Sequence, residues 1–193
     1  METSKRMIEL VINSFRESAD VKLAFVETYA QQIVEVGQII AQALKDGNKL
    51  LLFGNGGSAA DAQHIAGEIV GRFKKERKAL PAIALTTDTS ILTAVGNDYG
   101  FESVFERQIE ALCMPGDVVI GITTSGDSPN VVRGIAKAHD LGATTIAFTG
   151  KGGGKVVQIA HYSFVVPSYE TPRIQECHIT LGHVLCEIID ALL

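Results

Sequence analysis

Five short apolar runs separated by longer helical patterns constrain the fold more than any other feature of this sequence. Each run ends at glycine, a hydroxyl residue or another turn former, and each is too short for a buried helix. Continuous apolar runs of this length are typical of parallel strands covered on both faces, and parallel neighbours are joined by helical crossovers. The pattern therefore predicts an α/β protein with a doubly wound, five-stranded parallel sheet. The expected strands are residues 50–54, 82–86, 117–123, 144–150 and 162–167.

Apolar residues recur at spacings of three and four between the strands, which predicts helices there. The same spacing fills residues 2–46, before any strand, and we expect two N-terminal helices in that stretch. No repeat, linker or low-complexity tract divides the chain, so residues 1–193 are predicted to form one domain. The remaining expected helices are residues 58–72, 89–95, 101–113, 129–141 and 172–193.

Composition excludes several classes of protein. With 46% hydrophobic and 20% charged residues, the chain is too apolar to be disordered. Its apolar runs are much shorter than the roughly 18 to 20 residues of a membrane span, and its charged N-terminus does not resemble a signal peptide. A net charge of −5 without a basic stripe argues against nucleic-acid binding. We expect a cytoplasmic protein without membrane or nucleic-acid partners.

Three cysteines, Cys113, Cys177 and Cys186, occur in apolar helical contexts. Their odd number and the absence of a C-x-x-C spacing do not suit a disulfide framework. We expect them to be core thiols.

The first strand ends in a glycine-rich turn, Gly54 to Asp61. Ser58 and Asp61 are spaced as a capping box, so a tight strand-to-helix turn is one interpretation. A dinucleotide fingerprint is a weaker one, because Ala59 occupies the place of its third glycine and the acidic residue expected about 20 positions later is missing.

The third strand ends in a run rich in hydroxyl groups, Thr123 to Asn130. Ser128 before Pro129 is a favourable helix N-cap and needs no ligand to explain it. The hydroxyls of Thr123, Thr124 and Ser125 are not needed for capping. At a helix N-terminus they suit a phosphate monoester, and we favour an anion site here.

Two helices carry candidate acid–base or metal-binding side chains. His64 and Glu68 are four residues apart and share one helix face, which suits a surface pair, half of a metal site or an acid–base couple. The last helix contains Gln175 and His183, which lie about 12 Å apart along a helix axis. Spacing alone leaves these alternatives open, and we assign structural roles to His139, His161 and His178.

Five segments together resemble the phosphoheptose isomerases of the sugar isomerase (SIS) family, and the resemblance covers nearly the whole chain. They are residues 54–64, 96–100, 124–128, 150–153 and 173–176. The resemblance implies a flavodoxin-like SIS domain that assembles as a homotetramer, with helices 1–46 packing on the domain and in the oligomer. It further implies a ketose–aldose isomerase that converts sedoheptulose 7-phosphate to D-glycero-D-manno-heptose 7-phosphate, the entry to ADP-heptose and lipopolysaccharide core biosynthesis.

The resemblance also assigns residues. Glu68 and His183 would be catalytic, and one zinc ion per subunit would be held by His64, Glu68, Gln175 and His183. Thr123 stands where the family often has serine, which keeps the hydroxyl and adds a methyl group. The residues implied to line the substrate are Asn55, Gly56, Gly57, Ser58, Glu68, Arg72, Asn97, Asp98, Thr123, Thr124, Ser125, Ser128 and Gln175.

Two other functions are compatible with the same fold. One branch of the family resembles this chain but binds the bacterial replication initiator, and a non-catalytic sugar-phosphate sensor is a further alternative. That branch has no acidic residue at the position of Glu68 and has asparagine at that of His183, whereas this chain has both groups. The enzyme is therefore the favoured interpretation. We expect the glycine run 150–154 to be a strand-to-helix turn rather than another phosphate cradle.

Overall fold

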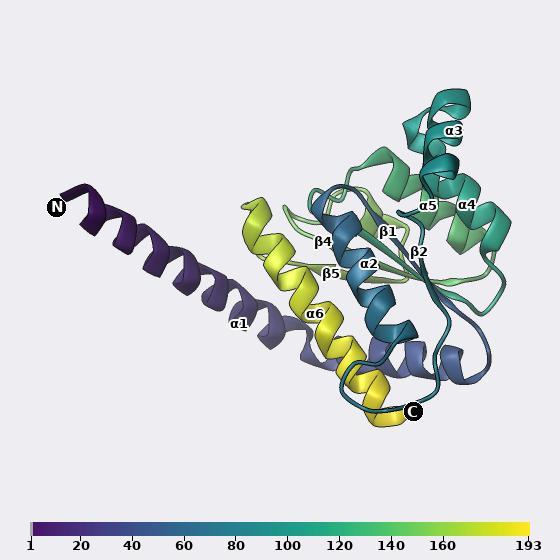
Figure 1. Ribbon diagram of the computed structural model, residues 1–193, viewed down its shortest axis with the longest axis horizontal. Coiled ribbons are helices and arrows are strands. Elements are labelled where there is room, and N and C mark those ends of the chain that lie inside the picture. The colour runs from purple at the N-terminus through teal and green to yellow at the C-terminus, as the bar shows by residue number, and fades with distance from the viewer. Residues whose placement is uncertain (1) are drawn as a thin grey trace.

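The computed structural model describes residues 2–193, which form a parallel sheet flanked by helices (Figure 1). The strands are β1 (Leu50–Gly54), β2 (Ala82–Ala84), β3 (Val118–Thr123), β4 (Thr144–Thr149) and β5 (Tyr162–Val165). The helices are α1 (Glu2–Lys45), α2 (Gly57–Val70), α3 (Thr89–Tyr99), α4 (Val104–Leu112), α5 (Pro129–Asp140) and α6 (Thr171–Leu192), with 3₁₀ turns η1 (Phe101–Ser103) and η2 (Val156–Gln158).

The five strands are all parallel, in the order β2-β1-β3-β4-β5. This confirms the predicted doubly wound sheet. The central strands β1 and β3 are buried along their whole length, as their continuous apolar sequences require. The edge strand β2 is shorter than predicted and ends at Ala84. The helix predicted over residues 101–113 begins as the separate 3₁₀ turn η1.

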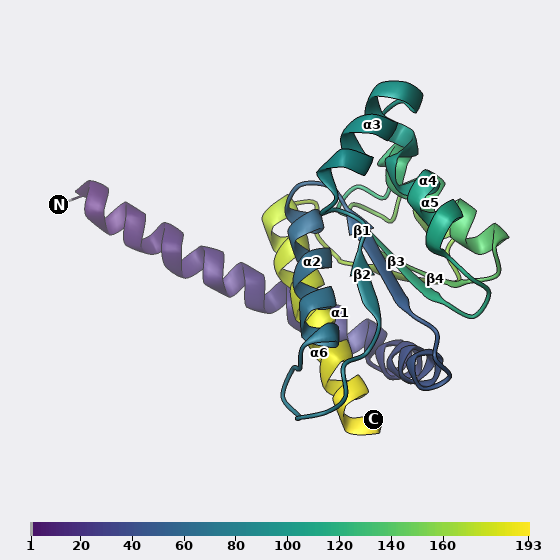
Figure 2. The same cartoon turned by 45° about the vertical axis from the view of Figure 1, so that its right-hand side comes forward.

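Helices cover both faces of the sheet (Figure 2). On one face α1, α2 and α6 bury a core that includes Phe25, Phe148 and Phe164. On the other face α4 and α5 bury a second core, in which the rings of Phe53 and Phe105 stack with centroids 4.9 Å apart. The three cysteines are buried and free, which confirms them as core thiols. Within the described residues, no helix is long and apolar enough to cross a membrane.

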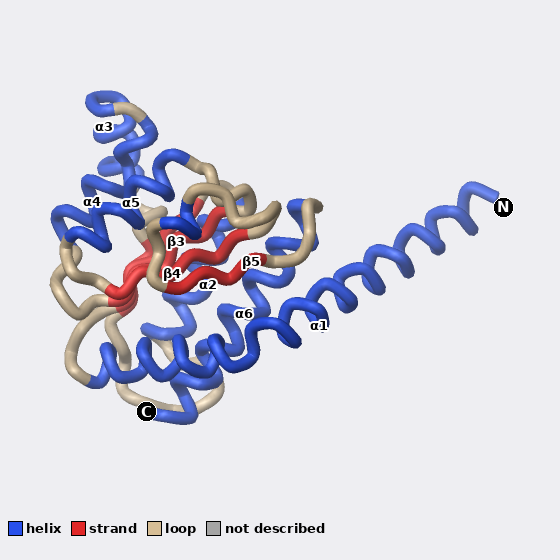
Figure 3. The backbone as a smooth tube through the Cα atoms, turned by 180° about the vertical axis from the view of Figure 1, so that it is seen from behind, coloured by secondary structure: helices blue, strands red, loops and turns tan. Residues whose placement is uncertain are grey.

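The prediction of two helices within residues 2–46 is wrong, because α1 is one continuous helix of 44 residues (Figure 3). No proline occurs in this stretch and its first glycine is Gly37, so nothing in the sequence breaks the helix earlier. Gly37 instead allows close packing, since a Cβ there would lie 2.6 Å from Cγ2 of Ile188 on α6. The first half of α1 extends away from the sheet, and its first buried residue with a described side chain is Phe25.

Candidate active site

The candidate site lies where the winding of the sheet reverses, at the carboxyl ends of β1 and β3. These strands are neighbours, yet β1 leads toward β2 on one side and β3 leads toward β4 on the other. Loops that leave adjacent strands in opposite directions leave a crevice between them, where ligands of open α/β sheets bind. The glycine turn after β1 and the hydroxyl loop after β3 therefore face the same crevice.

The capping box predicted for Ser58 and Asp61 does not form at the start of α2. Gly56 is the N-cap of α2, with a positive φ of 55°, and no side chain bonds the helix end. Ser58 is buried inside the first turn instead of preceding the helix. Asp61 has a buried Oδ2 without a hydrogen-bond partner among the described residues. Burial raises the pKa of Asp61, and the nearby His64 partly opposes this shift.

Asn55 joins the two loops through a reciprocal pair of amide hydrogen bonds with Asn130. Asn55 Nδ2 donates to Asn130 Oδ1 over 2.9 Å, and Asn130 Nδ2 donates to Asn55 Oδ1 over 2.8 Å. The pair holds the end of β1 against the first turn of α5. Beside it lies a pocket of about 240 Å³, which is lined by Asn55, Phe101, Glu102, Ser128, Pro129 and Asn130. Sequence reasoning placed Asn130 in the hydroxyl loop but gave it no role.

The hydroxyl loop brings three of its predicted side chains together. Thr123 Oγ1 lies 3.0 Å from Ser128 Oγ and 3.5 Å from Ser125 Oγ. Ser128 is the N-cap residue of α5, as predicted, but its side chain makes no capping hydrogen bond. Its hydroxyl is turned toward Thr123 instead. The capping interpretation therefore does not account for Ser128, and the hydroxyls cluster at a helix N-terminus.

The glycine run 150–154 and the two residues after it pack against the hydroxyl loop. Val156 N donates to Gly126 O over 3.0 Å, and Lys155 N donates to Asp127 Oδ1 over 3.1 Å. A Cβ on Gly126, whose φ is +73°, would lie 1.9 Å from Gly153 O, so only glycine allows this approach. The run connects β4 to η2, in agreement with the predicted turn.

The ring nitrogens of His64 and His183 meet between α2 and α6. The two Nε2 atoms are 2.9 Å apart, a distance at which one ring donates and the other accepts a hydrogen bond. His64 Nε2 also lies 3.3 Å from Glu68 Oε1. The side chains of His64 and Glu68 are 47% and 28% exposed, so the group remains open to solvent. Two imidazoles and a carboxylate from distant segments thus face one another.

Gln175, at the start of the second turn of α6, lies over the glycine turn. A Cβ on Gly57 would be 2.5 Å from Gln175 Nε2, so the amide occupies the space that the glycine leaves open. Across residues 2–193, no group of three or more His, Cys, Asp or Glu side chains already forms a metal-binding cluster. The contacts run instead as a chain from His183 through His64 to Glu68.

Three predicted site residues make no hydrogen bond or ion pair, within residues 2–193, with the glycine turn, the hydroxyl loop or the histidine pair. Arg72 lies just beyond α2 with its side chain 62% exposed and its Nε 3.5 Å from Glu76 Oε2. Asn97 and Asp98 lie on α3, a helix without buried residues, where Asn97 Nδ2 donates to Asp98 Oδ1 over 2.7 Å.

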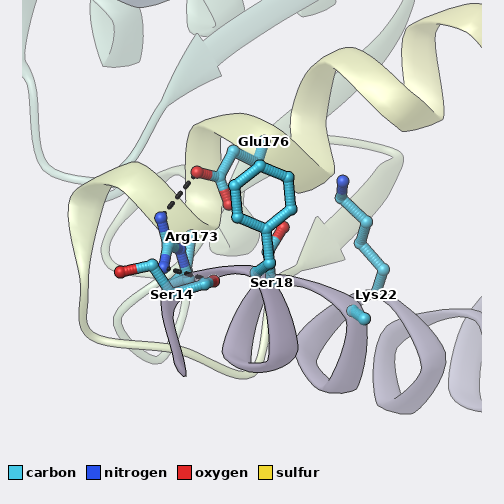
Figure 4. Close-up of a pocket in the computed structure, with 7 residues that line it drawn as sticks. Ser14, Ser18, Lys22, Arg173 and Glu176 are labelled. Carbon is cyan, nitrogen blue, oxygen red and sulfur yellow. Dashed lines mark hydrogen bonds and ion pairs between the residues drawn. The ribbon is translucent and has the colours of Figure 1, made fainter. Parts of the chain in front are cut away.

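A separate pocket of about 500 Å³ lies between α1 and the start of α6 (Figure 4). Arg173 crosses it, with Nη1 donating to Ser14 O over 2.9 Å and Nη2 to Glu176 Oε1 over 2.6 Å. These bonds connect the projecting half of α1 to the turn that carries Gln175.

Comparison with known proteins agrees with this fold. The family described as SIS domain matches residues 14–150, so the fold and the crevice define an SIS-domain protein. Phosphoheptose isomerase from Aquifex aeolicus is 80% identical over 186 residues, which are 96% of this chain and 97% of that protein. The structure of phosphoheptose isomerase from Neisseria gonorrhoeae is 44% identical, with a TM-score of 0.91 over 96% of this chain and 99% of that chain. A Francisella tularensis phosphoheptose isomerase is 37% identical, with a TM-score of 0.92 over 96% and 98% of the two chains.

The chain therefore belongs to the phosphoheptose isomerase family of SIS-domain proteins. These relatives favour neither the interaction module nor the non-catalytic sensor. The sequence resemblance is confirmed.

Proposed function

We propose that this protein is the isomerase that converts sedoheptulose 7-phosphate to D-glycero-D-manno-heptose 7-phosphate, the first step of ADP-heptose and lipopolysaccharide core biosynthesis. It is an enzyme of the family to which the chain belongs. The observation that carries the proposal is the meeting of Glu68, His64 and His183 between α2 and α6, in a chain that also gathers hydroxyl groups at the N-terminus of α5. This arrangement offers proton-transfer groups for one end of a sugar phosphate and an anion site for the other.

The phosphate of the substrate binds at the hydroxyl loop. Ser128, Thr123 and Ser125 present clustered hydroxyl groups at the N-terminus of α5. The first amides of a helix have no intrahelical acceptors, and the helix dipole favours negative charge there. Thr124 lies in the same loop and supplies a further hydroxyl. Asn55, Gly56 and Gly57 border the sugar from the turn after the neighbouring strand β1.

Isomerisation moves the carbonyl from C2 to C1. The Glu68 carboxylate removes a proton from C1 and returns it to C2, and the intermediate between these transfers is an enediolate. His183 exchanges protons with the sugar oxygens and assists the opening of the ring. Both groups must reach adjacent atoms of one substrate, which their common contact with His64 supports.

The same side chains fit a zinc site. Two nitrogen ligands of a tetrahedral zinc ion lie about 3.3 Å apart, so the 2.9 Å between the two Nε2 atoms would have to widen only slightly. We propose one zinc ion per subunit, which His64, Glu68 and His183 would hold with Gln175 as a fourth ligand; Gln175 would have to move from its place against Gly57. When bound, zinc supplies Lewis-acid polarisation of the substrate carbonyl. A carboxylate held tightly by zinc would be a weaker base, so Glu68 could act as the base only if it did not also bind the metal tightly.

The assembly is a homotetramer built through α1. Its projecting half exposes large apolar side chains that nothing in the described chain covers, including Ile8 at 58%, Leu10 at 57% and Phe15 at 77% exposed. Monomeric proteins rarely expose a continuous apolar face of this kind. Light scattering after size exclusion should give four times the 20.6 kDa subunit mass. A monomer would contradict this part of the proposal.

The site of action is the cytoplasm. The three buried cysteines of this protein are all free, which suits a reducing compartment.

The decisive experiment incubates the purified protein with sedoheptulose 7-phosphate and follows aldose formation. Activity should disappear after treatment with a chelator and return with Zn²⁺. The variant Glu68→Gln, which keeps the side-chain shape and removes the base, is the matched control. Absence of aldose under every metal condition would reject the enzyme and favour the interaction module.

A further inference from the structure

The loop between α2 and β2, residues 71–81, is fastened to the last helix by a buried ion pair. Arg77 Nε donates to Asp190 Oδ1 over 2.8 Å, and the two side chains are only 5% and 6% exposed. The backbone N–H groups of Lys74 and Lys75 donate to Asp190 Oδ2 over 2.8 and 3.0 Å. One carboxylate on α6 therefore accepts three hydrogen bonds from a loop that has no secondary structure of its own.

The same guanidinium ties the loop to the end of α2. Arg77 Nη1 donates to Ile69 O over 2.9 Å and Nη2 donates to Glu68 O over 3.1 Å. The last carbonyls of a helix have no intrahelical donors, and α2 has no basic residue in its last turn. Arg77 satisfies these carbonyls from outside the helix. The loop is thus bound to the helix of Glu68 and to the helix of His183 by one side chain.

This anchoring places Phe73 against the imidazole of His183. The ring centroids are 5.6 Å apart and the planes are inclined by 21°, a stacked arrangement. The imidazole also contacts His64, whose Nε2 lies 2.9 Å from His183 Nε2. The ring torsion of a histidine has only a broad intrinsic preference, so neighbouring groups decide the direction of its nitrogens. A flat ring on one face and a hydrogen-bond partner at the edge together fix that direction.

We propose that Phe73 is a positioning residue for His183, and that the Arg77–Asp190 pair anchors the loop that presents it. The proposal rests on the role of His183 in metal binding and proton transfer given above. Phe73 touches neither of the proposed reacting atoms and acts through the imidazole. Its stacking keeps Nε2 of His183 directed at Nε2 of His64, so that both nitrogens are ready to share one ligand.

The test compares Phe73→Leu, which keeps apolar bulk but removes the flat ring, with Phe73→Tyr, which keeps the ring. Lys75→Ala is the control from the same loop, because Lys75 contacts Asp190 through its backbone and its side chain is exposed. The affinity of the chelator-treated protein for Zn²⁺ is measured by competition with a chromophoric chelator. Melting temperature, kcat and KM for sedoheptulose 7-phosphate are recorded for each variant.

Phe73→Leu should weaken Zn²⁺ binding and lower kcat by about 10- to 100-fold each, as loss of a group that orients a metal ligand does. KM should stay within about twofold because the hydroxyl loop is untouched. Phe73→Tyr and Lys75→Ala should behave like the wild type.

Three results would overturn the proposal. They are wild-type Zn²⁺ affinity and kcat in Phe73→Leu, an equal loss in Lys75→Ala, and a lower melting temperature without a change in Zn²⁺ affinity, which would mark a merely structural role. Failure of the wild-type protein itself to bind Zn²⁺ and to form aldose would instead reject the proposed function, so the two failures are distinguishable.

Discussion

His64 and His183 are 119 residues apart in the chain, yet their Nε2 atoms lie 2.9 Å from each other. The close packing of α2 on α6 accounts for this. A Cβ on Gly182 would lie 2.6 Å from Cδ1 of Ile65, so the absence of a side chain lets the two helices approach at that level. Gly182 and Ile65 each adjoin one of the histidines. Gly182 therefore allows His64 and His183, two candidate metal ligands on different helices, to come into contact.

Glu68→Gln should lower kcat by about 100- to 10,000-fold, the usual contribution of a general base. The amide retains an oxygen able to face His64 but cannot accept the proton from C1. KM should change little, because the phosphate is held at the hydroxyl loop. Steady-state kinetics with sedoheptulose 7-phosphate measure both constants. A wild-type rate in this variant would refute the assignment of Glu68 as the base.

Ser128→Ala should raise KM by about 10- to 100-fold, because a hydrogen bond to a charged group contributes about 1.5 to 3 kcal/mol. Asp88 provides the control, because it is an N-cap residue whose side chain does cap its helix. It precedes α3 and accepts a hydrogen bond from Ile91 N over 2.9 Å. Asp88→Ala should cost about 1 kcal/mol of unfolding free energy and leave KM unchanged. Kinetics and urea unfolding on both variants separate the two roles. A Ser128→Ala protein with normal KM would speak against a phosphate at this loop.

Gly57→Ala should reduce activity with little loss of stability. The new methyl group would lie 2.5 Å from Gln175 Nε2, and a flexible amide can move away at low cost, but it then leaves the site. Gly67→Ala in the same helix is the control, since a Cβ there meets nothing within 4 Å. It should raise stability by about 1 kcal/mol through helix propensity and keep the activity. Equal activities in the two variants would show that the position of Gln175 does not matter.

Acid should destabilise the protein partly through His178. Burial lowers the pKa of His178 from 6.5 to about 4, and its hydrogen bond with Thr149 O only partly opposes this. Below pH 6.5 the unfolded chain therefore binds a proton at this ring while the folded chain does not. The free energy of unfolding should fall by up to about 3 kcal/mol between pH 6.5 and 4 from this group.

Urea unfolding of the wild type and His178→Gln at pH 7.5, 5.5 and 4.5 checks this expectation. The difference in stability between the two proteins should shrink as the pH falls. A difference that is constant across the three pH values would contradict it.

The hydroxyl loop shows which features local sequence signals can predict. Ser128 before Pro129 predicts the start of α5 correctly, because an N-cap followed by proline is a local preference. The direction of the Ser128 hydroxyl is decided by Thr123, which lies at the end of the adjoining strand. The capping box of Ser58 and Asp61 is wrong for a related reason. Gly56, with its positive φ, starts the helix earlier and places Ser58 inside its first turn.

Local patterns in the sequence predict the succession of strands and helices along the chain and the strand ends at which polar groups collect. These follow from the period of apolar residues and from the turn residues after them, which act over a few positions. The pairing of Asn55 with Asn130 and the stacking of Phe73 on His183 are visible only in the tertiary structure. These contacts join residues far apart in the chain. They depend on how closely helices pack, which no local spacing encodes.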